Sequence, residues 1–166
     1  MSMKIIAPIA AGVLLALAGT AQAATKTTTF QVQASVVTNC TISVANLLLG
    51  AFDGELDLAA SAPITVRCTN GTPFNVNLST GSSGNFANRT MTGPGGTLVY
   101  NLYTENVTYS TIWGDTTNST GRLGGVGAGM GSPQTLTIFG RLLASQNTGQ
   151  IDAGAFSDTI TATILY

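Results

Sequence analysis

The sequence predicts an all-β protein, an immunoglobulin-like β-sandwich of about seven short strands. Apolar and polar residues alternate with a period of two in segment after segment, and threonine fills many of the polar positions, which is typical of strands. Turn-forming residues separate these segments at short intervals. No segment after residue 23 carries the apolar stripe of an amphipathic helix. Short strands joined by close turns favour a sandwich over a closed barrel.

The first element is a signal peptide over residues 1–23. Lys4 precedes an apolar run at 5–17, and a small-residue stretch ends in the Ala-Gln-Ala cleavage site at 21–23. The run is shorter than the roughly 20 apolar residues of a membrane-spanning helix, so a retained anchor is the weaker alternative. We therefore expect an exported chain with no transmembrane segment after cleavage.

The chain that follows the signal peptide has the size of a single domain. It is divided into an N-terminal strand over residues 24–38 and a β-sandwich domain over residues 39–166. The whole sequence holds six Lys and Arg, seven Asp and Glu, and no histidine. The basic residues after position 23 are scattered singly, whereas binding a polyanion depends on clusters of them. We expect no nucleic-acid partner.

The two cysteines of the sequence, Cys40 and Cys68, both follow the cleavage site. An oxidising compartment outside the cytoplasm favours their pairing, so we predict a disulfide. Closing a loop of this size restricts the unfolded chain by roughly 3 to 4 kcal/mol. The alternative, free thiols or metal ligands, lacks CxxC spacing and any histidine to complete a site.

Eight segments are predicted to be strands or strand pieces. The first spans residues 27–37, with Phe30, Val32, Ala34 and Val36 on one face. The others span residues 40–44, 64–68, 74–78, 89–92, 98–104, 135–141 and 159–165. Residues 59–62 are expected to form one loose turn ahead of a proline.

The glycine-rich segment 121–130 is predicted to be a flexible hairpin loop. Its Gly125, Gly127 and Gly129 are the alternative sign of a phosphate cradle. Such a cradle needs a preceding strand and a following helix, and neither is predicted.

The sequence offers no set of side chains suited to catalysis, a cofactor or a metal. Without histidine, Ser-His-Asp and Cys-His arrangements are impossible. Paired carboxylates stay formally open, but charged residues make up only 8% of the chain, which argues against an active cleft. Asp53, Glu55 and Asp57 are predicted to form a solvated acidic turn, with a calcium site as the alternative. Trp113 is predicted to pack at a sheet end, with a carbohydrate platform as the alternative.

The two outermost predicted strands suggest that the sandwich is incomplete. The last one, at 159–165, is followed only by Tyr166, and the first begins almost at the cleavage site. A sandwich that stops on a core strand is expected to keep an open edge or an apolar groove. An unpaired edge invites aggregation unless it is filled, and a strand donated by another chain is one way to fill it.

A series of short motifs adds a family resemblance. They are the alternating strand 30–36 ahead of Cys40, Leu-Gly-Ala-Phe-Asp at 49–53, Cys-Thr-Asn-Gly-Thr-Pro-Phe at 68–74, Arg-Thr-Met at 89–91, Leu-Val-Tyr-Asn-Leu-Tyr-Thr at 98–104, Ile-Trp-Gly-Asp at 112–115, Gly-Arg at 140–141 and the closing stretch 154–166. In this order and spacing, the chain after its signal peptide resembles the spore coat protein U family, which includes the pilins of archaic chaperone-usher pathways.

The resemblance implies an immunoglobulin-like fold that lacks its final strand. A periplasmic pilus chaperone would cap it, an outer-membrane usher would pass it on, and the N-terminal strand of another pilin subunit would complete it. The donor side chains would be Phe30, Val32, Ala34 and Val36. The acceptor groove would be lined in part by Ile160, Ala162, Ile164 and Tyr166.

We therefore expect a structural pilus subunit that supports adhesion or biofilm formation, passing through the periplasm to the cell surface. Its single domain, where the family's tip adhesins have two, favours a shaft or adaptor position. The alternatives are a spore or cell-surface coat protein, and a lectin-like module that uses Trp113 with Tyr100, Tyr103 or Tyr109. Residues 27–37 would, in a competing interpretation, be the first strand of their own domain.

Overall fold

The computed structural model describes residues 22–166, so the predicted signal peptide lies almost entirely outside the described residues. The chain divides into two units, one ending at Ser35 and one spanning Val36–Tyr166. Every strand of the described chain belongs to the second unit.

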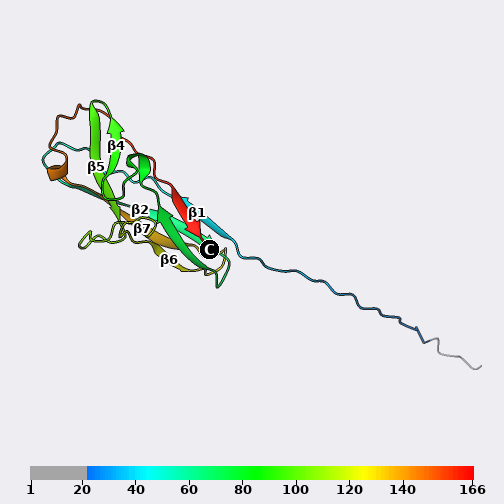
Figure 1. The fold of residues 1–166 in the computed structure, drawn as a ribbon. Coiled ribbons are helices and arrows are strands. Elements are labelled where there is room, and N and C mark those ends of the chain that lie inside the picture. Colours follow the sequence, from blue (N-terminus) through cyan, green and yellow to red (C-terminus); the bar gives the residue numbers. More distant parts are fainter. Residues whose placement is uncertain (1–21) are drawn as a thin grey trace, which may run out of the picture. The chain divides into compact units, whose positions relative to one another are not determined.

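Eight strands form a sandwich of two antiparallel sheets (Figure 1). They are β1 (Cys40–Val44), β2 (Leu58–Cys68), β3 (Pro73–Leu78), β4 (Arg89–Gly93), β5 (Gly96–Tyr103), β6 (Leu123–Val126), β7 (Gln134–Leu142) and β8 (Ala162–Leu165), with short 3-10 helices η1 (Gly81–Ser83) and η2 (Ala144–Gln146). One sheet has the strand order β1-β2-β7-β5-β4 and the other β6-β3-β8. The predicted immunoglobulin-like sandwich is confirmed, with eight strands where about seven were expected. No helix within residues 22–166 is long and apolar enough to cross a membrane.

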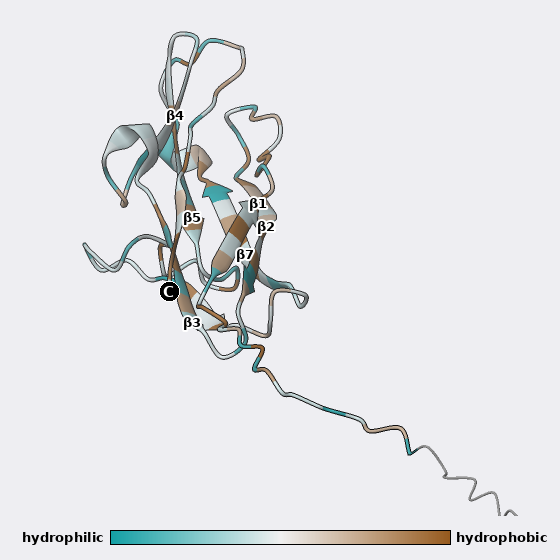
Figure 2. Ribbon diagram, turned by 90° about the vertical axis from the view of Figure 1, so that its right-hand side faces the viewer, coloured by the Kyte–Doolittle hydropathy of each residue, from teal (hydrophilic) through white to brown (hydrophobic). Residues whose placement is uncertain are grey.

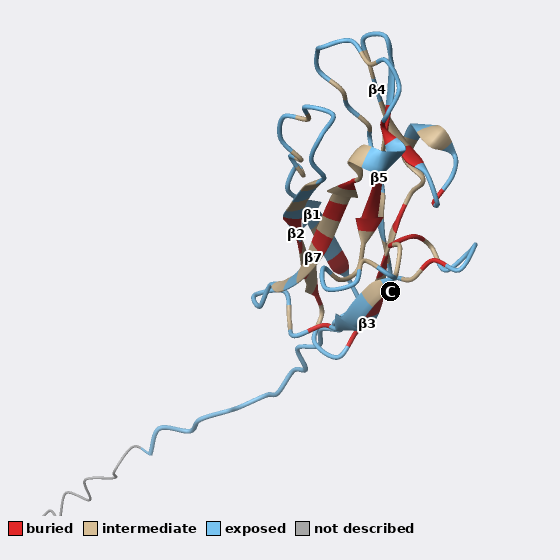
Figure 3. Ribbon diagram, turned by 90° about the vertical axis from the view of Figure 1, so that its left-hand side faces the viewer, coloured by how far each residue is buried: buried red, intermediate tan, exposed pale blue. Residues whose placement is uncertain are grey.

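The core lies between the two sheets and follows the period of two in the sequence. In β3, Phe74, Val76 and Leu78 are buried while the asparagines between them are only partly covered. Figure 2 shows hydrophobic stretches interspersed with hydrophilic ones along the strands, and Figure 3 shows buried residues alternating with less buried ones along β7. This alternation buries one face of each sheet.

The disulfide between Cys40 and Cys68 is confirmed. It joins the first residue of β1 to the last residue of β2, which are register partners in the ladder. The bridge therefore closes the end of the sandwich at which the N-terminal segment joins β1.

The expected turn at residues 59–62 is wrong, because these residues belong to β2. Ala60 pairs with Gly140 and Ala62 pairs with Ile138 of β7. Small residues carry a weak local preference, and pairing with a central strand overrides it. β2 is therefore eleven residues long rather than five.

The expected flexible loop at 121–130 is also wrong in part, because it contains β6. Strand β6 pairs with β3, placing Gly124 opposite Asn75 and Gly125 opposite Phe74. A Cβ atom at Gly124 would collide with the carbonyl oxygen of Phe74. The close approach of the two backbones therefore requires glycine here. Because glycine has no side chain, the segment lacks the alternation that marks a strand in a sequence.

The arm, defined as residues 24–38, forms no strand in the described chain. Phe30, Val32 and Val36 are 85%, 85% and 87% exposed. The competing interpretation, in which residues 27–37 are the first strand of their own domain, is therefore wrong.

The end of the arm is anchored by hydrogen bonds. The amide of Asn39 donates to the Thr69 hydroxyl at 3.0 Å, and that hydroxyl lies 3.3 Å from the carbonyl oxygen of Val37.

Candidate functional site: a groove between two sheet edges

The candidate site lies where each sheet has an edge without a partner strand. Within residues 22–166, β1 pairs only with β2, and β8 pairs only with β3. The last strand is shorter than predicted, since β8 begins at Ala162 and residues 159–161 precede it without joining the ladder. The segments that continue these two edges are residues 45–52 after β1 and residues 151–161 before β8.

Between these segments runs a groove made of two adjoining pockets, of about 510 and 700 Å³. Both pockets are lined by Leu47, Leu48, Leu49, Met91 and Phe156, so they form one continuous depression. Each pocket alone has the volume of a typical ligand site, but two adjoining pockets lined largely by apolar side chains suit an extended peptide better than a compact molecule.

One wall of the groove is the segment that follows β1. Leu47 and Leu49 are half-buried while Leu48 is exposed, which is the alternation of an extended chain. A Cβ atom added to Gly140 of β7 would contact the side chains of Leu47 and Leu49, so both leucines point towards the sheet. After the Ala45 amide, which donates to Pro63, the backbone of residues 46–52 has no backbone hydrogen-bond partner in the described chain.

The opposite wall is the segment that leads into β8. Burial alternates here too: Phe156, Asp158, Ile160 and Ala162 are partly buried and the residues between them are exposed. The amide and carbonyl of Ser157 both pair with Thr92 of β4. Since successive residues of a strand direct these groups to opposite edges, Asp158 and Ile160 direct theirs towards the groove. Within residues 22–166 neither has a backbone partner. Both walls therefore present unpaired backbone.

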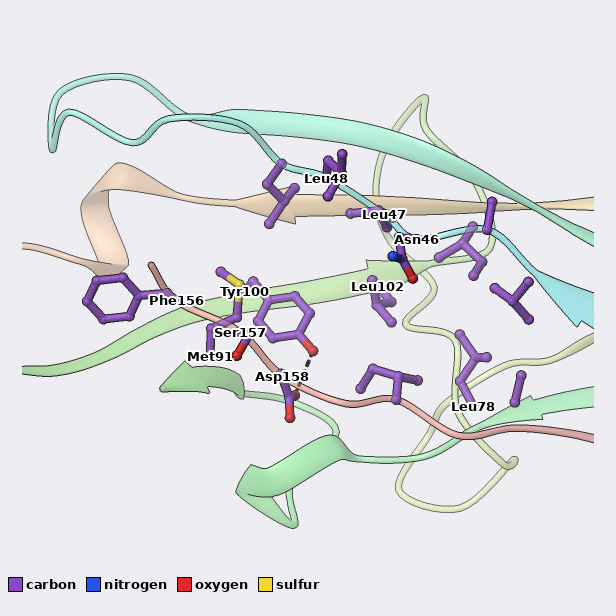
Figure 4. A pocket seen from close by; sticks show the side chains of 16 residues that line it. Asn46, Leu47, Leu48, Leu78, Met91, Tyr100, Leu102, Phe156, Ser157 and Asp158 are labelled. Atoms are coloured by element: carbon purple, nitrogen blue, oxygen red, sulfur yellow. Dashed lines mark hydrogen bonds between the residues drawn. The ribbon is translucent and has the colours of Figure 1, made fainter. Parts of the chain in front are cut away.

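The floor of the first pocket is formed by core strands. Leu78 of β3, Leu102 of β5 and Ile138 of β7 are buried and line it from below. Figure 4 shows Leu47 and Leu48 on one side of this pocket and Phe156, Ser157 and Asp158 on the other. An occupant would meet hydrophobic side chains that already belong to the core.

Tyr100 and Asp158 form a hydrogen-bonded polar pair in the first pocket. The buried Tyr100 hydroxyl donates to Asp158 Oδ2 at 2.7 Å (Figure 4). The amides of Ser82 and Thr159 donate to Asp158 Oδ1. Burial, followed by this hydrogen bond, raises the pKa of Tyr100. Burial also acts to raise the pKa of Asp158, but the hydrogen bonds from Tyr100 and Ser82 outweigh it and leave the pKa below its usual value. The pair therefore stays a neutral phenol bonded to a carboxylate at neutral pH.

A buried arginine lies next to this pair. Arg89, the cross-strand partner of Tyr100, is 0% exposed and donates to the carbonyl oxygens of Ser79 and Trp113 and to Asn101 Oδ1. Its guanidinium lies 5.2 Å from the centre of the Phe86 ring. Burial lowers the pKa of Arg89 to about 10, so it stays charged at neutral pH. This network fixes β4 and β5 beneath the groove.

The predicted groove residues are placed differently along the last segment. Ile160 and Ala162 line the first pocket. Ile164 packs against the core, and Tyr166 is 58% exposed. Whether a donated strand contacts these four residues stays a prediction.

The sequence reasoning missed the wall formed by residues 47–49 and the pair Tyr100 and Asp158. The leucine run at 47–49 was an available signal, because apolar residues outside any predicted strand need a place to pack.

Trp113 does not offer a carbohydrate platform. The side chain is 0% exposed and its indole Nε1 donates to the carbonyl oxygen of Val76 at 2.8 Å. Asp115 accepts hydrogen bonds from Thr117 in its own turn. The predicted structural role of Trp113 is confirmed, and a lectin-like use of this residue is wrong.

The acidic turn at 53–57 is held by local hydrogen bonds. Asp53 Oδ1 accepts from the amides of Glu55 and Leu56, and these bonds lower the pKa of Asp53. Asp57 pairs with Arg141 at 3.0 Å and accepts from the amide of Ala144. Residues 22–166 contain no group of three His, Cys, Asp or Glu side chains placed to hold a metal ion.

Comparisons with known proteins give one family and one fold. The Spore Coat Protein U domain pattern matches residues 26–163 of the chain. The fold is similar to the solved CsuC-CsuE chaperone-tip adhesion subunit pre-assembly complex from archaic chaperone-usher Csu pili of Acinetobacter baumannii, with a TM-score of 0.57 and 22% sequence identity. The match covers 80% of this chain and 40% of the matched chain, so this chain spans less than half of that chain's length. No curated protein matches the sequence.

Proposed function

The chain belongs to the Spore Coat Protein U domain family, and we propose that it is a structural subunit of a surface pilus assembled by donor-strand exchange. A periplasmic chaperone holds the subunit after export, an outer-membrane usher takes it into the fibre, and other pilin subunits are its neighbours there. The fold it shares with the solved chaperone-subunit complex supports the chaperone as a partner.

The observation that carries the proposal is the groove with unpaired backbone on both walls. Residues 46–52 and the groove-facing backbone of Asp158 and Ile160 have the hydrogen-bonding capacity for one further strand between the two walls of the groove. Buried backbone groups are almost always paired, so a chain that covers this groove has to supply those bonds. β-Augmentation meets that requirement with backbone hydrogen bonds and alternate side chains in pockets.

The arm is the proposed donor. Phe30, Val32, Ala34 and Val36 occupy alternate positions of an extended segment and are all exposed. Burying a large apolar side chain contributes about 1.5 to 3 kcal/mol, so the face as a whole contributes roughly 5 to 9 kcal/mol before ordering is subtracted. A join of this strength is long-lived, as a fibre requires.

The subunit acts through assembly and not through catalysis. The carboxylates at 53, 57, 115 and 158 are each engaged by a turn amide or by an arginine or tyrosine side chain. Export through the signal peptide leads to the periplasm and then to the fibre at the cell surface. Adhesion or biofilm formation is the role that such a fibre supports.

Val32→Asp tests the proposal. In the bacterium that makes the protein, the variant should lose its surface fibres while chaperone-bound subunit persists in the periplasm, because an unpaired carboxylate is strongly unfavourable inside an apolar groove. Gln33→Asp is the matched control, since Gln33 is its neighbour on the opposite face of the arm and should keep its fibres.

Electron microscopy and a periplasmic immunoblot give the result. Normal fibres from Val32→Asp would refute strand donation by the arm. A coat protein deposited without a pilus would yield no fibres from the unmodified chain either.

A further inference from the structure

The groove wall leading into β8 has a distinct order of side-chain sizes. Its inward positions are Phe156, Asp158, Ile160 and Ala162, so a large residue, a polar one, a medium one and a small one follow each other. Before Phe156 the alternation stops, because residues 152–155 are all exposed. The wall therefore offers four consecutive positions to a strand beside it.

Asp158 is the position that restricts an occupant most. Its carboxylate is bonded to the Tyr100 hydroxyl and to two backbone amides, so it is fixed in place. A bulky apolar side chain directly over it would strip the remaining water from a charge without replacing it. A small residue leaves room for that water.

The arm also carries four alternating positions, with one small residue among larger ones. They are Phe30, Val32, Ala34 and Val36. Ala34 is the only one of them short enough to lie over Asp158 without covering it.

We infer that the arm of one copy lies antiparallel to residues 156–162 of the next copy, with Ala34 directly opposite Asp158. This inference rests on the proposed function and adds its register. It places Val32 opposite Ile160, Val36 opposite Phe156 and Phe30 opposite Ala162. Ala162 is the smallest side chain of the wall, and Leu78, Leu102 and Ile138 form an apolar floor beside it.

The competing registers fit worse. A shift by two residues in either direction puts Val32 or Val36 over the Asp158 carboxylate. A parallel arm with Ala34 over Asp158 carries Phe30 to Gly154, in the stretch 152–155 where all residues are exposed and the alternation has stopped. The pair Ala34 and Asp158 thus determines which strand fits and in which register.

Cysteine pairs on the outward face of both strands test the register without disturbing the groove. Gln33 and Thr159 are both exposed and are opposed in the proposed register, as are Gln31 and Thr161. Thr159 directs its backbone to the same side as Ser157, away from the groove, so it belongs to a non-hydrogen-bonded pair, in which side chains lie closest. Opposed Cβ atoms are about 4.5 to 5.5 Å apart and diagonal ones about 7 to 8 Å, which separates pairs that can form a disulfide from pairs that cannot.

The full chain carrying Gln33→Cys with Thr159→Cys is expressed in its own bacterium, and the second pair is Gln31→Cys with Thr161→Cys. The native cysteines are bonded to each other and do not compete. After boiling in detergent without reductant, both pairs should give a ladder of multimers that collapses to monomer on reduction. The controls, Gln33→Cys with Ser157→Cys or with Thr161→Cys, should stay monomeric.

The possible outcomes test the register separately from the proposed strand donation. A ladder from a control pair, with none from the two proposed pairs, would overturn the register and leave strand donation standing. A disulfide confined to the monomer would overturn exchange between copies. If no pair gives a ladder while the Val32→Asp variant still makes fibres, donation by the arm is itself wrong.

Discussion

Arg89 is a single residue on which much of the domain's interior depends. Its guanidinium supplies hydrogen bonds to Ser79, Asn101 and Trp113, which come from three separate parts of the chain. Asn101 in turn donates to the carbonyl oxygens of Phe86 and Ala87. A buried cation is tolerated here because its donors reach acceptors rather than an apolar surface.

Arg89→Met should lower the free energy of unfolding by about 3 kcal/mol or more. The methionine fills much of the space but leaves the carbonyl oxygens of Ser79 and Trp113 without their donor, and each such loss costs about 1 to 3 kcal/mol. Urea denaturation of the purified chain measures the change. Arg122→Met is the matched control, because Arg122 is exposed and its loss should fall within about 0.5 kcal/mol. Equal stability of the two variants would contradict the structural role given to Arg89.

For single residues, the sequence predicts those roles that depend on neighbours in the chain or on residue counts. The pairing of Cys40 with Cys68 follows from their number and compartment, and the turn role of Asp115 follows from its neighbours. The burial of Arg89 could not be predicted, because its partners come from Ser79, Asn101 and Trp113. The pair Tyr100 and Asp158 was hidden for the same reason, since 58 positions separate the two residues.

Among the elements, β6 shows how backbone proximity selects a sequence. Gly124 and Gly125 face Asn75 and Phe74 of β3, and the Gly124 position leaves no space for a side chain. Gly127 is restricted in the same way, since a Cβ atom there would collide with the carbonyl oxygen of Thr69 and crowd Cys68. The segment is therefore built for close contact with its neighbours.

Gly124→Ala should destabilise the domain by about 1 to 3 kcal/mol, the usual penalty of overpacking at a site that cannot expand. Gly131→Ala is the control, since nothing lies within 4 Å of the added methyl group. Thermal unfolding followed by circular dichroism compares the two. A melting temperature for Gly124→Ala equal to that of the control would contradict the close approach of β6 to β3.

Strands that bury one face were predicted well from alternation, as β3, β5 and β7 show. The two failures have a common physical origin. Residues 59–62 of β2 and the two central residues of β6, Gly124 and Gly125, are small, so their place in a sheet is decided by the strands beside them. The start of β8 was placed too early because residues 159–161 alternate like a strand but border the open groove.

For the whole molecule, the proposed strand exchange predicts that stability rises when the groove is occupied. A synthetic peptide of residues 24–38, added to the purified chain at about 100 times its dissociation constant, should raise the free energy of unfolding by about 2.7 kcal/mol. A rise in melting temperature measures it, and the same peptide with Val32→Asp serves as the control. Identical curves with and without the first peptide would mean that the groove does not accept the arm.

The sandwich class could be predicted from composition and alternation. The form of the groove could not, because it depends on the departure of residues 45–52 from β2 after the last backbone bond of Ala45. Such a departure leaves no periodic trace in the sequence.

The attachment of the arm has a mechanical consequence. Thr69 holds the backbone at Val37 and Asn39, and the next residue, Cys40, is covalently joined to Cys68 at the end of the longest strand. A tensile load applied along the arm therefore passes through a covalent bridge into β2, which pairs with β1 over residues 64–68 and with β7 over residues 58–66. Unfolding the subunit by pulling on the arm would require the ladders of β2 with β1 and with β7 to shear at the same time. The segment between Val36 and Cys40 is short, so it extends little before the load reaches the disulfide.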